Sequence, residues 1–171
     1  MPFSTYDASL GLLLKGLHSL DKILAKAEEH AKANDINVED YATAKLYEDM
    51  LALDFQVNSC VDTSTKCAAR LLGTEPVEWN REEKTYADFR KKTTKAIEIL
   101  TKVDPAAVEG KEANTITMGI GNGKTRDLLA KDYITSYTLP NFFFHLQTTY
   151  AILRLKGVPL GKLDYLSSFS S

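Results

Sequence analysis

The spacing of apolar residues near the N-terminus constrains the fold more than any other feature of the sequence. Large apolar side chains recur at steps of three and four residues: Leu10, Leu13, Leu14, Leu17, Leu20, Ile23, Leu24 and Ala27. This period is typical of an amphipathic helix that buries one face. We therefore predict a first long helix from about Tyr6 to Lys32.

Three later segments share this period, and one between them does not. The spacing predicts further helices over about Leu46–Leu72, Tyr86–Lys102 and Pro140–Lys156, and a short helical turn around Val38–Lys45. Between residues 104 and 131 the period is lost, and the alternation in Thr115–Ile120 before Gly121-Asn122-Gly123 predicts a β-hairpin. Four long helices and a minor hairpin indicate an all-α four-helix bundle with a crossover, as one domain over residues 1–171.

Residues that end or begin helices support these bounds. Gly73 and Gly157 would end the second and fourth long helices, and Thr85 with Asp88 resembles an N-terminal capping box. Pro140 is tolerated in a first helical turn. Gly123-Lys-Thr is superficially similar to a phosphate-binding loop, but Met118 stands where that loop needs its first glycine. The hairpin turn is therefore the better interpretation.

Composition excludes several classes of function. The chain has 171 residues, 44% hydrophobic and 26% charged, which suits one soluble domain with a real core. A formal charge of −2 offers no basic field for nucleic acid. We find no apolar run of about 18 residues and no secretory leader, so we expect a soluble cytoplasmic protein without membrane contact. Cys60 and Cys67, seven positions apart on one helix, are too distant for a disulfide and are expected to be buried apolar residues.

A polar seam crosses the apolar fourth helix. Asn141, His145 and Thr149 are spaced four residues apart and share one helix face. A buried polar group needs a hydrogen-bond partner, a water, a metal or a ligand. A satisfied core histidine and a functional one are equally compatible with His145 at this point. For His18 and His30 we favour surface or packing roles.

The second long helix offers a matching polar set. Asp49 and Gln56 are seven apart and share one face, while Asn58 and Asp62 are one turn apart on another. An inward carboxylate could orient an imidazole and raise its pKa. The alternative is equally open: Asp49 caps the helix start, while Asn58 and Asp62 are solvated.

Several motifs together resemble one family over essentially the whole chain. They are Tyr6–Ser9, Asp49–Val57 followed by Asp62, Leu139–His145, Tyr150–Arg154, Gly157–Lys162 and Asp164-Tyr165. They resemble domain of unknown function nineteen ninety-three (DUF1993), a branch of the DinB/YfiT-like superfamily. The resemblance implies a four-helix bundle in an up-down-down-up arrangement. Many superfamily members are metal-dependent thiol transferases or hydrolases that use three histidines.

The resemblance also implies where a site would lie. The superfamily's last helix carries His-x-x-x-His, then an arginine nine and a glycine twelve positions after the second histidine. His145, Arg154 and Gly157 fit this spacing, but Asn141 replaces the first histidine, and Gln56 is the candidate counterpart of the remaining ligand. Two amides and one imidazole are poor ligands for a divalent metal, so we expect no cofactor.

Three functional hypotheses follow. The leading one is a metal-independent pocket of Gln56, Asn141 and His145 that binds a small organic molecule, with His145 as acid/base in an isomerisation, cyclisation or elimination. The second is a divalent metal on His145 with Asp49 or Asp62, and the third a non-catalytic ligand-sensing or dimerisation module. We expect a homodimer. The remaining candidate residues are Asp62 for catalysis, and Asp49, Phe142 or Phe144, Thr149 and Tyr150 for ligand contact.

Overall fold

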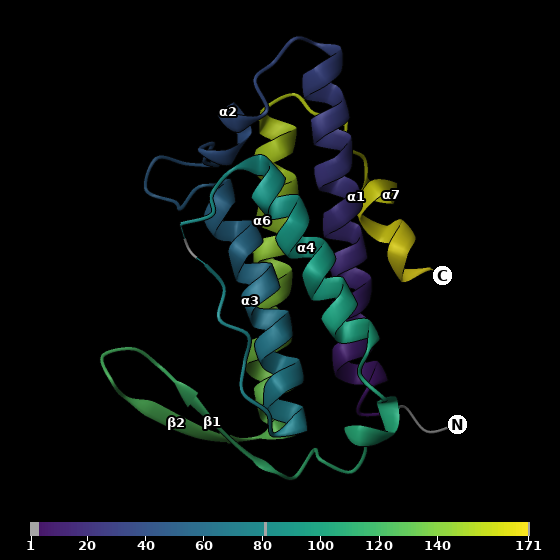
Figure 1. Cartoon of the computed structure of the whole chain (residues 1–171), viewed down its shortest axis with the longest axis vertical. Helices are drawn as coiled ribbons and strands as arrows, with labels where there is room; N and C mark the ends of the chain where they lie inside the picture. Colours follow the sequence, from purple (N-terminus) through teal and green to yellow (C-terminus); the bar gives the residue numbers. More distant parts are fainter. Residues whose placement is uncertain (1–3, 81, 171) are drawn as a thin grey trace.

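The computed structural model describes residues 4–80 and 82–170. Its framework is four long helices, α1 (Leu12–Ala33), α3 (Leu53–Leu72), α4 (Tyr86–Thr101) and α6 (Leu139–Leu155). α1 and α6 run in one direction and α3 and α4 in the other (Figure 1). α3 packs against both α4 and α6, as α1 does. The predicted four-helix bundle is confirmed, with the helix directions that the resemblance implied.

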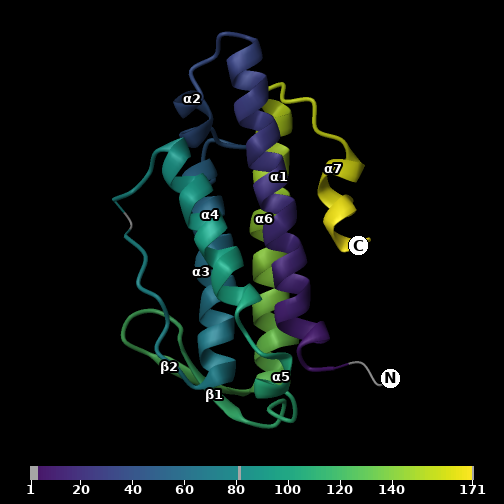
Figure 2. The same ribbon diagram turned by 45° about the vertical axis from the view of Figure 1, so that its right-hand side comes forward.

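Because α3 and α4 are parallel neighbours, the chain must return along the bundle between them. Residues 73–80 and 82–85 belong to this crossover beside α3 (Figures 1 and 2). Gly73 ends α3 in the left-handed conformation, at φ +74°. The Thr74 N–H then donates to the Ala69 carbonyl at 2.9 Å, which satisfies a terminal helix acceptor. At the far end Thr85 and Asp88 form the predicted capping box that begins α4.

A buried lysine ties the crossover to the bundle. The Lys92 side chain on α4 is 2% exposed. Its Nζ donates to the carbonyls of Asn80 at 2.6 Å and Glu83 at 2.9 Å, and to Asn58 Oδ1 on α3 at 3.1 Å. A buried ammonium is tolerable only when such acceptors replace its hydration. One side chain therefore holds the crossover, α3 and α4 together.

The second long helix begins at Leu53, so the prediction of a start at Leu46 was wrong. Residues 43–52 form turns and extended chain, and the predicted turn near Val38 is α2 (Glu39–Ala42). Leu46, Tyr47 and Leu51 are 39%, 65% and 54% exposed, so these large apolar side chains form no buried face against the bundle. Without burial to support it, its helical period does not produce a helix.

The fourth helix starts earlier than predicted. α5 (Ala130–Tyr133), a π-helical turn η3 (Ile134–Thr138) and α6 follow one another without a break. Pro140 therefore lies within a longer rod. Proline has no N–H and its ring crowds the preceding turn of an α-helix. The wider turn, in which the Leu139 N–H reaches the Ile134 carbonyl, accommodates it.

Smaller elements close the two ends of the bundle. The predicted hairpin is confirmed as β1 (Thr115–Gly119) and β2 (Thr125–Leu129), antiparallel, and it projects from the end of the bundle where α6 begins (Figure 1). After α6, α7 (Lys162–Leu166) and the 3-10 turn η4 (Ser167–Phe169) return along α1 (Figure 2). The Lys26–Asp164 ion pair, at 2.9 Å, joins α7 to α1. These two elements were not predicted, because each is too short to show a period.

The core lies between the four helices, and α1 and α6 approach closely at Gly16. A Cβ on Gly16 would lie 2.3 Å from Phe142 Cε1, so only glycine fits against this fully buried ring. Cys60 and Cys67 are also fully buried, and burial raises the pKa of Cys67 to about 12. Both are unreactive packing residues, as predicted.

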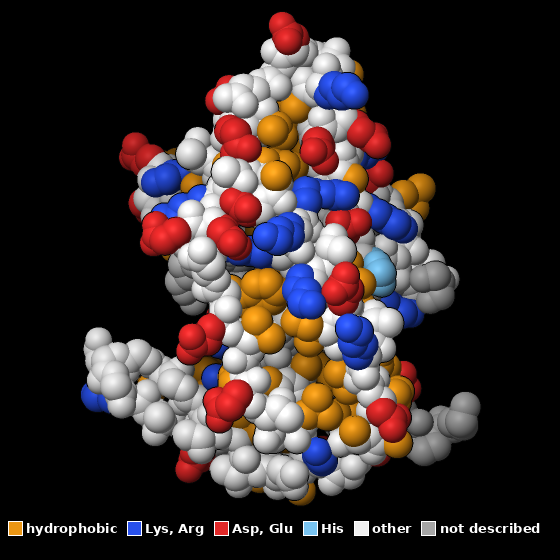
Figure 3. Space-filling view, in the orientation of Figure 1, with side chains coloured by type: hydrophobic (Ala, Val, Ile, Leu, Met, Phe, Trp, Pro, Cys, Tyr) orange, Lys and Arg blue, Asp and Glu red, His pale blue; other side chains and the backbone are white. Residues whose placement is uncertain are grey.

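On the face shown in Figure 3, neither acidic nor basic side chains predominate. Acidic and basic side chains are interspersed over α1 and α4 (Figure 3). Within residues 4–80 and 82–170, no helix is both long and apolar enough to cross a membrane.

Candidate functional site

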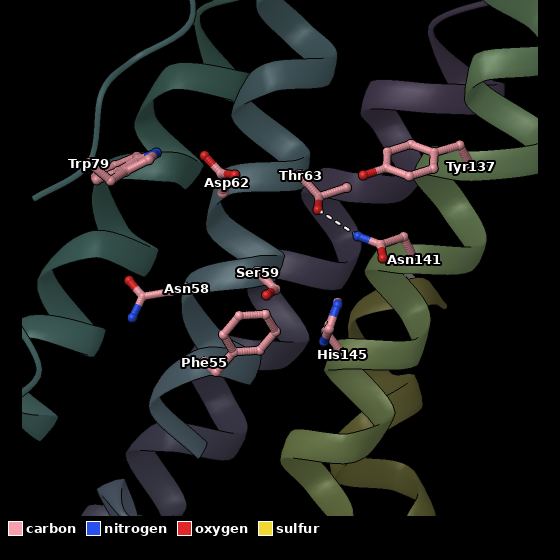
Figure 4. A pocket seen from close by; sticks show the side chains of 9 residues that line it. All are labelled: Phe55, Asn58, Ser59, Asp62, Thr63, Trp79, Tyr137, Asn141 and His145. Carbon is pink, nitrogen blue, oxygen red and sulfur yellow. Dashed lines mark hydrogen bonds between the residues drawn. The ribbon is translucent and has the colours of Figure 1, made fainter. Parts of the chain in front are cut away.

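A cavity of about 220 Å³ lies on the outer side of the bundle between α3 and α6. The crossover forms its third wall through Trp79, whose Nε1 donates to Thr65 Oγ1 on α3 at 3.2 Å. Most of its lining side chains are polar (Figure 4). They are Phe55, Asn58, Ser59, Asp62 and Thr63 from α3, Trp79, Tyr137 from η3, and Asn141 and His145 from α6.

His145 is held in one orientation by Gln56. Its Nδ1 lies 2.7 Å from Gln56 Oε1, and Gln56 Nε2 donates to the Leu51 carbonyl at 2.9 Å. If the Gln56 amide were rotated by 180°, its oxygen would face the Leu51 carbonyl oxygen, and two acceptors repel each other. The Gln56 oxygen therefore faces the ring, and His145 Nδ1 is the donor. The neutral ring therefore carries its proton on Nδ1. Its Nε2, with a lone pair, has no partner among the described residues.

Burial keeps this imidazole neutral. His145 is half-buried, with the edges of Phe55 and Phe144 packed at centroid distances of 5.8 and 5.3 Å. Desolvation of the charged form lowers the pKa of His145 below its ordinary value of 6.5. At neutral pH the ring is therefore a hydrogen-bond acceptor and a potential base at Nε2.

This lowered pKa makes the stability of the protein depend on His145 at acidic pH. The unfolded chain binds a proton near pH 6.5 that the folded protein binds only at lower pH. The contribution of the neutral ring to the free energy of unfolding is complete above pH 6.5. It is lost as the pH falls through the pKa of His145 in the folded protein. In urea unfolding between pH 7.5 and 5.0, we expect wild type to lose more stability than His145→Gln. Parallel curves for the two proteins would contradict the lowered pKa.

Asn141 forms the second fixed point of the cavity. Its Nδ2 donates to Thr63 Oγ1 across the α3–α6 interface at 2.9 Å. One ring nitrogen of His145 points along the cavity toward this pair (Figure 4). The Asn141 Oδ1 accepts no hydrogen bond from the described residues. Two acceptors, Asn141 Oδ1 and His145 Nε2, are thus available to a bound molecule.

The structure brings some of the sequence-predicted residues together and separates others. Asp62, Asn141 and His145 line the cavity, and Gln56 lies directly behind His145. Asp62 Oδ2 accepts from Lys66 Nζ at 2.6 Å, one turn along α3. Asp49 lies in an exposed turn before α3 and shares no helix face with Gln56, which corrects that prediction.

Three predicted contact residues on α6 face elsewhere. Phe142 is part of the core against Gly16. The Thr149 hydroxyl is buried and donates to the His145 carbonyl of its own helix at 3.0 Å. The Tyr150 hydroxyl donates to the Leu160 carbonyl at 3.3 Å, near Tyr165. Of the aromatic candidates, only Phe144 lies beside His145.

Sequence reasoning missed five lining residues: Phe55, Ser59, Thr63, Trp79 and Tyr137. The first three are spaced four apart on α3, so the same rule that found Asn141 and His145 could have found them. Tyr137 is four residues before Asn141 and would have extended that seam, had the predicted helix not begun at Pro140. The crossover has no periodic pattern, so nothing in the sequence places Trp79 over α3.

The residues at this site do not fit the metal centre of the superfamily. Gln56 Oε1 is engaged by His145 Nδ1, so His145 Nε2 and Asn141 Oδ1 are the only lone-pair atoms that remain of the three corresponding positions. In the described part of the chain, no group of three or more His, Cys, Asp or Glu side chains could hold a metal ion. Divalent transition metals prefer imidazole, thiolate or carboxylate ligands, and only one imidazole is present here.

The arrangement defines the class of protein. A crystal structure of a DinB family member from Shewanella denitrificans superposes with a TM-score of 0.83, at 30% identity over 94% of this chain and 90% of that one. The protein is therefore a DinB-like helical bundle. Within that class the chain belongs to the family DUF1993, a domain of unknown function, whose profile matches residues 5–166. No curated protein matches the chain significantly.

Proposed function

We propose that the α3–α6 cavity binds a small organic molecule and that His145 moves a proton on it without a metal. The observation that carries this proposal is the 2.7 Å contact between His145 Nδ1 and Gln56 Oε1, from which we infer that the proton is on Nδ1 and that the Nε2 lone pair is left for a ligand in the cavity. A base needs an accessible lone pair and must be unprotonated at the working pH. The oriented imidazole offers the lone pair at Nε2, and its lowered pKa keeps the ring neutral at pH 7.

The proton transfer involves only residues of this chain. Nε2 takes a proton from an acidic C–H, N–H or O–H of the bound molecule, and the ring becomes an imidazolium. Gln56 Oε1 stabilises that cation, because the Nδ1–H···O bond strengthens when the ring is charged. Return of the proton to another atom of the ligand completes an isomerisation or a cyclisation. In an elimination the bond to the leaving group breaks and the leaving group takes the proton from Nε2, which restores the neutral ring. Asn141 and Thr63 would orient the ligand's polar groups.

The test begins with the tautomer and the content of the purified protein. We expect ¹⁵N NMR at pH 7.5 to show a protonated Nδ1 and an unprotonated Nε2 for His145. Native mass spectrometry and elemental analysis would detect co-purifying molecules and metal. The matched variants are His145→Gln at the cavity and His18→Gln, which changes an exposed residue on α1.

Binding is then measured with a library of small organic fragments. We expect fragments that shift the His145 resonances to bind about tenfold or more weakly to His145→Gln, which corresponds to about 1.4 kcal/mol, and equally well to His18→Gln. A protonated Nε2, or a stoichiometric metal lost in His145→Gln, would overturn the metal-free mechanism. A library in which no fragment affects His145 would overturn the binding site itself.

A further inference from the structure

We infer that the outer face of α6 is the contact surface of a homodimer, in which α6 packs antiparallel against α6 of a second copy. The outer face consists of side chains that recur at steps of three and four residues and therefore lie on one side of the helix: Pro140, Phe144, Gln147, Ala151 and Leu155. This inference does not depend on the function proposed above, and each can fail without the other.

The outer face of α6 is exposed although it is largely apolar. Its two largest side chains, Phe144 and Leu155, are 57% and 62% exposed. The other sides of α6 pack against α3 and α1. The solvent side of a bundle helix normally carries charges, as α4 does with Lys91, Lys95 and Glu98. A continuous exposed apolar surface instead marks a place where another molecule binds.

The lack of charge on this face favours a second copy of the chain as the partner. From Leu139 to Leu153 the sequence of α6 contains no Asp, Glu, Lys or Arg. The face therefore brings no like charges together when it meets itself. A strongly charged partner would lose its hydration against this face without gaining an ion pair. A second copy offers an equally apolar surface and has no such cost.

The order of large and small side chains along the face is self-complementary. In an antiparallel pair of α6 helices centred beside Gln147, Phe144 of each copy lies opposite Ala151 of the other, and Pro140 lies opposite Leu155. Helices pack best when large side chains of one enter the gaps that small side chains leave on the other. This contact uses the same surface of both copies, so it closes at two copies.

The neighbouring part of α3 enlarges the contact surface. Phe55 is 39% exposed, and its ring packs against the ring of His145, as the ring of Phe144 does. The outer face of α6 and the start of α3 together measure roughly 23 by 20 Å, from the helix rise and diameter, and their corrugated surface approaches the roughly 800 Å² that a standard interface covers on each partner. A second copy bound here would also cover the outer side of the α3–α6 cavity.

Sedimentation velocity of the full chain at micromolar concentrations tests the contact. We expect wild type to sediment with the mass of two 19.0 kDa chains. Gln147 is exposed and lies beside the twofold axis, so Gln147→Glu and Gln147→Lys each place two like charges opposite each other. Each change should raise the dissociation constant of the dimer about tenfold or more. Circular dichroism should show that both variants remain folded, because the changed side chain is on the surface.

A mixture of the two charge variants tests the antiparallel arrangement. Equimolar Gln147→Glu and Gln147→Lys should form a heterodimer of wild-type affinity or better, because opposite charges then face each other. The matched controls are Leu163→Glu and Leu163→Lys, which change a side chain on α7 that is 79% exposed. Both controls should remain dimers.

Several outcomes would overturn the inference. A monomeric wild type excludes the dimer, and dimers that both Gln147 changes leave intact exclude α6 as the contact. A mixture that stays monomeric excludes the antiparallel pairing, and dissociation of the Leu163 controls places the contact on another face. None of these results affects the proposed function, which the fragment library and the His145 resonances test separately.

Discussion

Replacement of Lys92 with methionine is expected to lower the free energy of unfolding by about 2–4 kcal/mol and to loosen the crossover. Methionine keeps most of the buried stem but removes the donor that the Asn80 and Glu83 carbonyls and Asn58 Oδ1 share. Each acceptor left without a donor costs about 1–3 kcal/mol when buried, and less where water can reach it. The carbonyls are in the crossover, so that segment should detach first.

Two measurements check this result. Urea unfolding gives the stability, and the emission of Trp79, which the crossover holds against α3, should shift to longer wavelength. Lys91→Met is the matched control, because the neighbouring lysine is exposed. A Lys92→Met protein with wild-type stability and emission would show that the lysine does not anchor the crossover.

The second large effect is expected from Gly16→Ala. The new methyl group would lie 2.3 Å from Cε1 and 2.8 Å from Cζ of Phe142, so the ring or a whole helix must move. Overpacking of this kind costs about 1–3 kcal/mol. Helix propensity acts in the other direction, since alanine in a helix is more stable than glycine by about 1 kcal/mol. We expect the clash to outweigh this gain. Thermal unfolding monitored by circular dichroism measures the difference.

A double-mutant cycle identifies the clash as the cause. Phe142→Leu removes the ring atoms that approach Gly16, so the two changes together should cost less than the sum of their separate effects. Gly119→Ala is the control, since a Cβ there would meet nothing within 4 Å. Additive effects of the Gly16 and Phe142 changes would contradict the close approach of α1 and α6.

The long helices could be predicted from sequence because burial alone determines their pattern. The residues from Leu10 to Ala27 repeat at helical spacing and form one buried face of η1 and α1. The predicted ends at Gly73 and Thr85 are also confirmed, since each depends on local chemistry. Helix starts were less predictable. Leu46 is four residues before Met50, which is helical spacing, but it is 39% exposed in a stretch that is not helical. The sequence does not show which apolar residues find a partner.

The site was only partly predictable for the same reason. A helix face can be read from spacing, which places Asn141 beside His145 and Asn58 near Asp62. Whether a residue on such a face points to a cavity or to the core depends on the neighbouring helix, which explains why Phe142 and Thr149 were assigned to the ligand. The contact between Gln56 and His145 joins two helices far apart in sequence, and only the family resemblance suggested it.

The π-helical turn Ile134–Thr138 sets the helical phase of the rod that carries the site. One extra residue is accommodated there, and each residue of an α-helix rotates the chain by about 100°. The buried Tyr133 before the turn and Ile134 at its start can therefore face the core, while Asn141 and His145 after the turn face α3. Deletion of a single residue from this turn would make the rod one continuous α-helix. Either the residues before the turn would then lose their contact with the core, or Asn141 and His145 would no longer face α3.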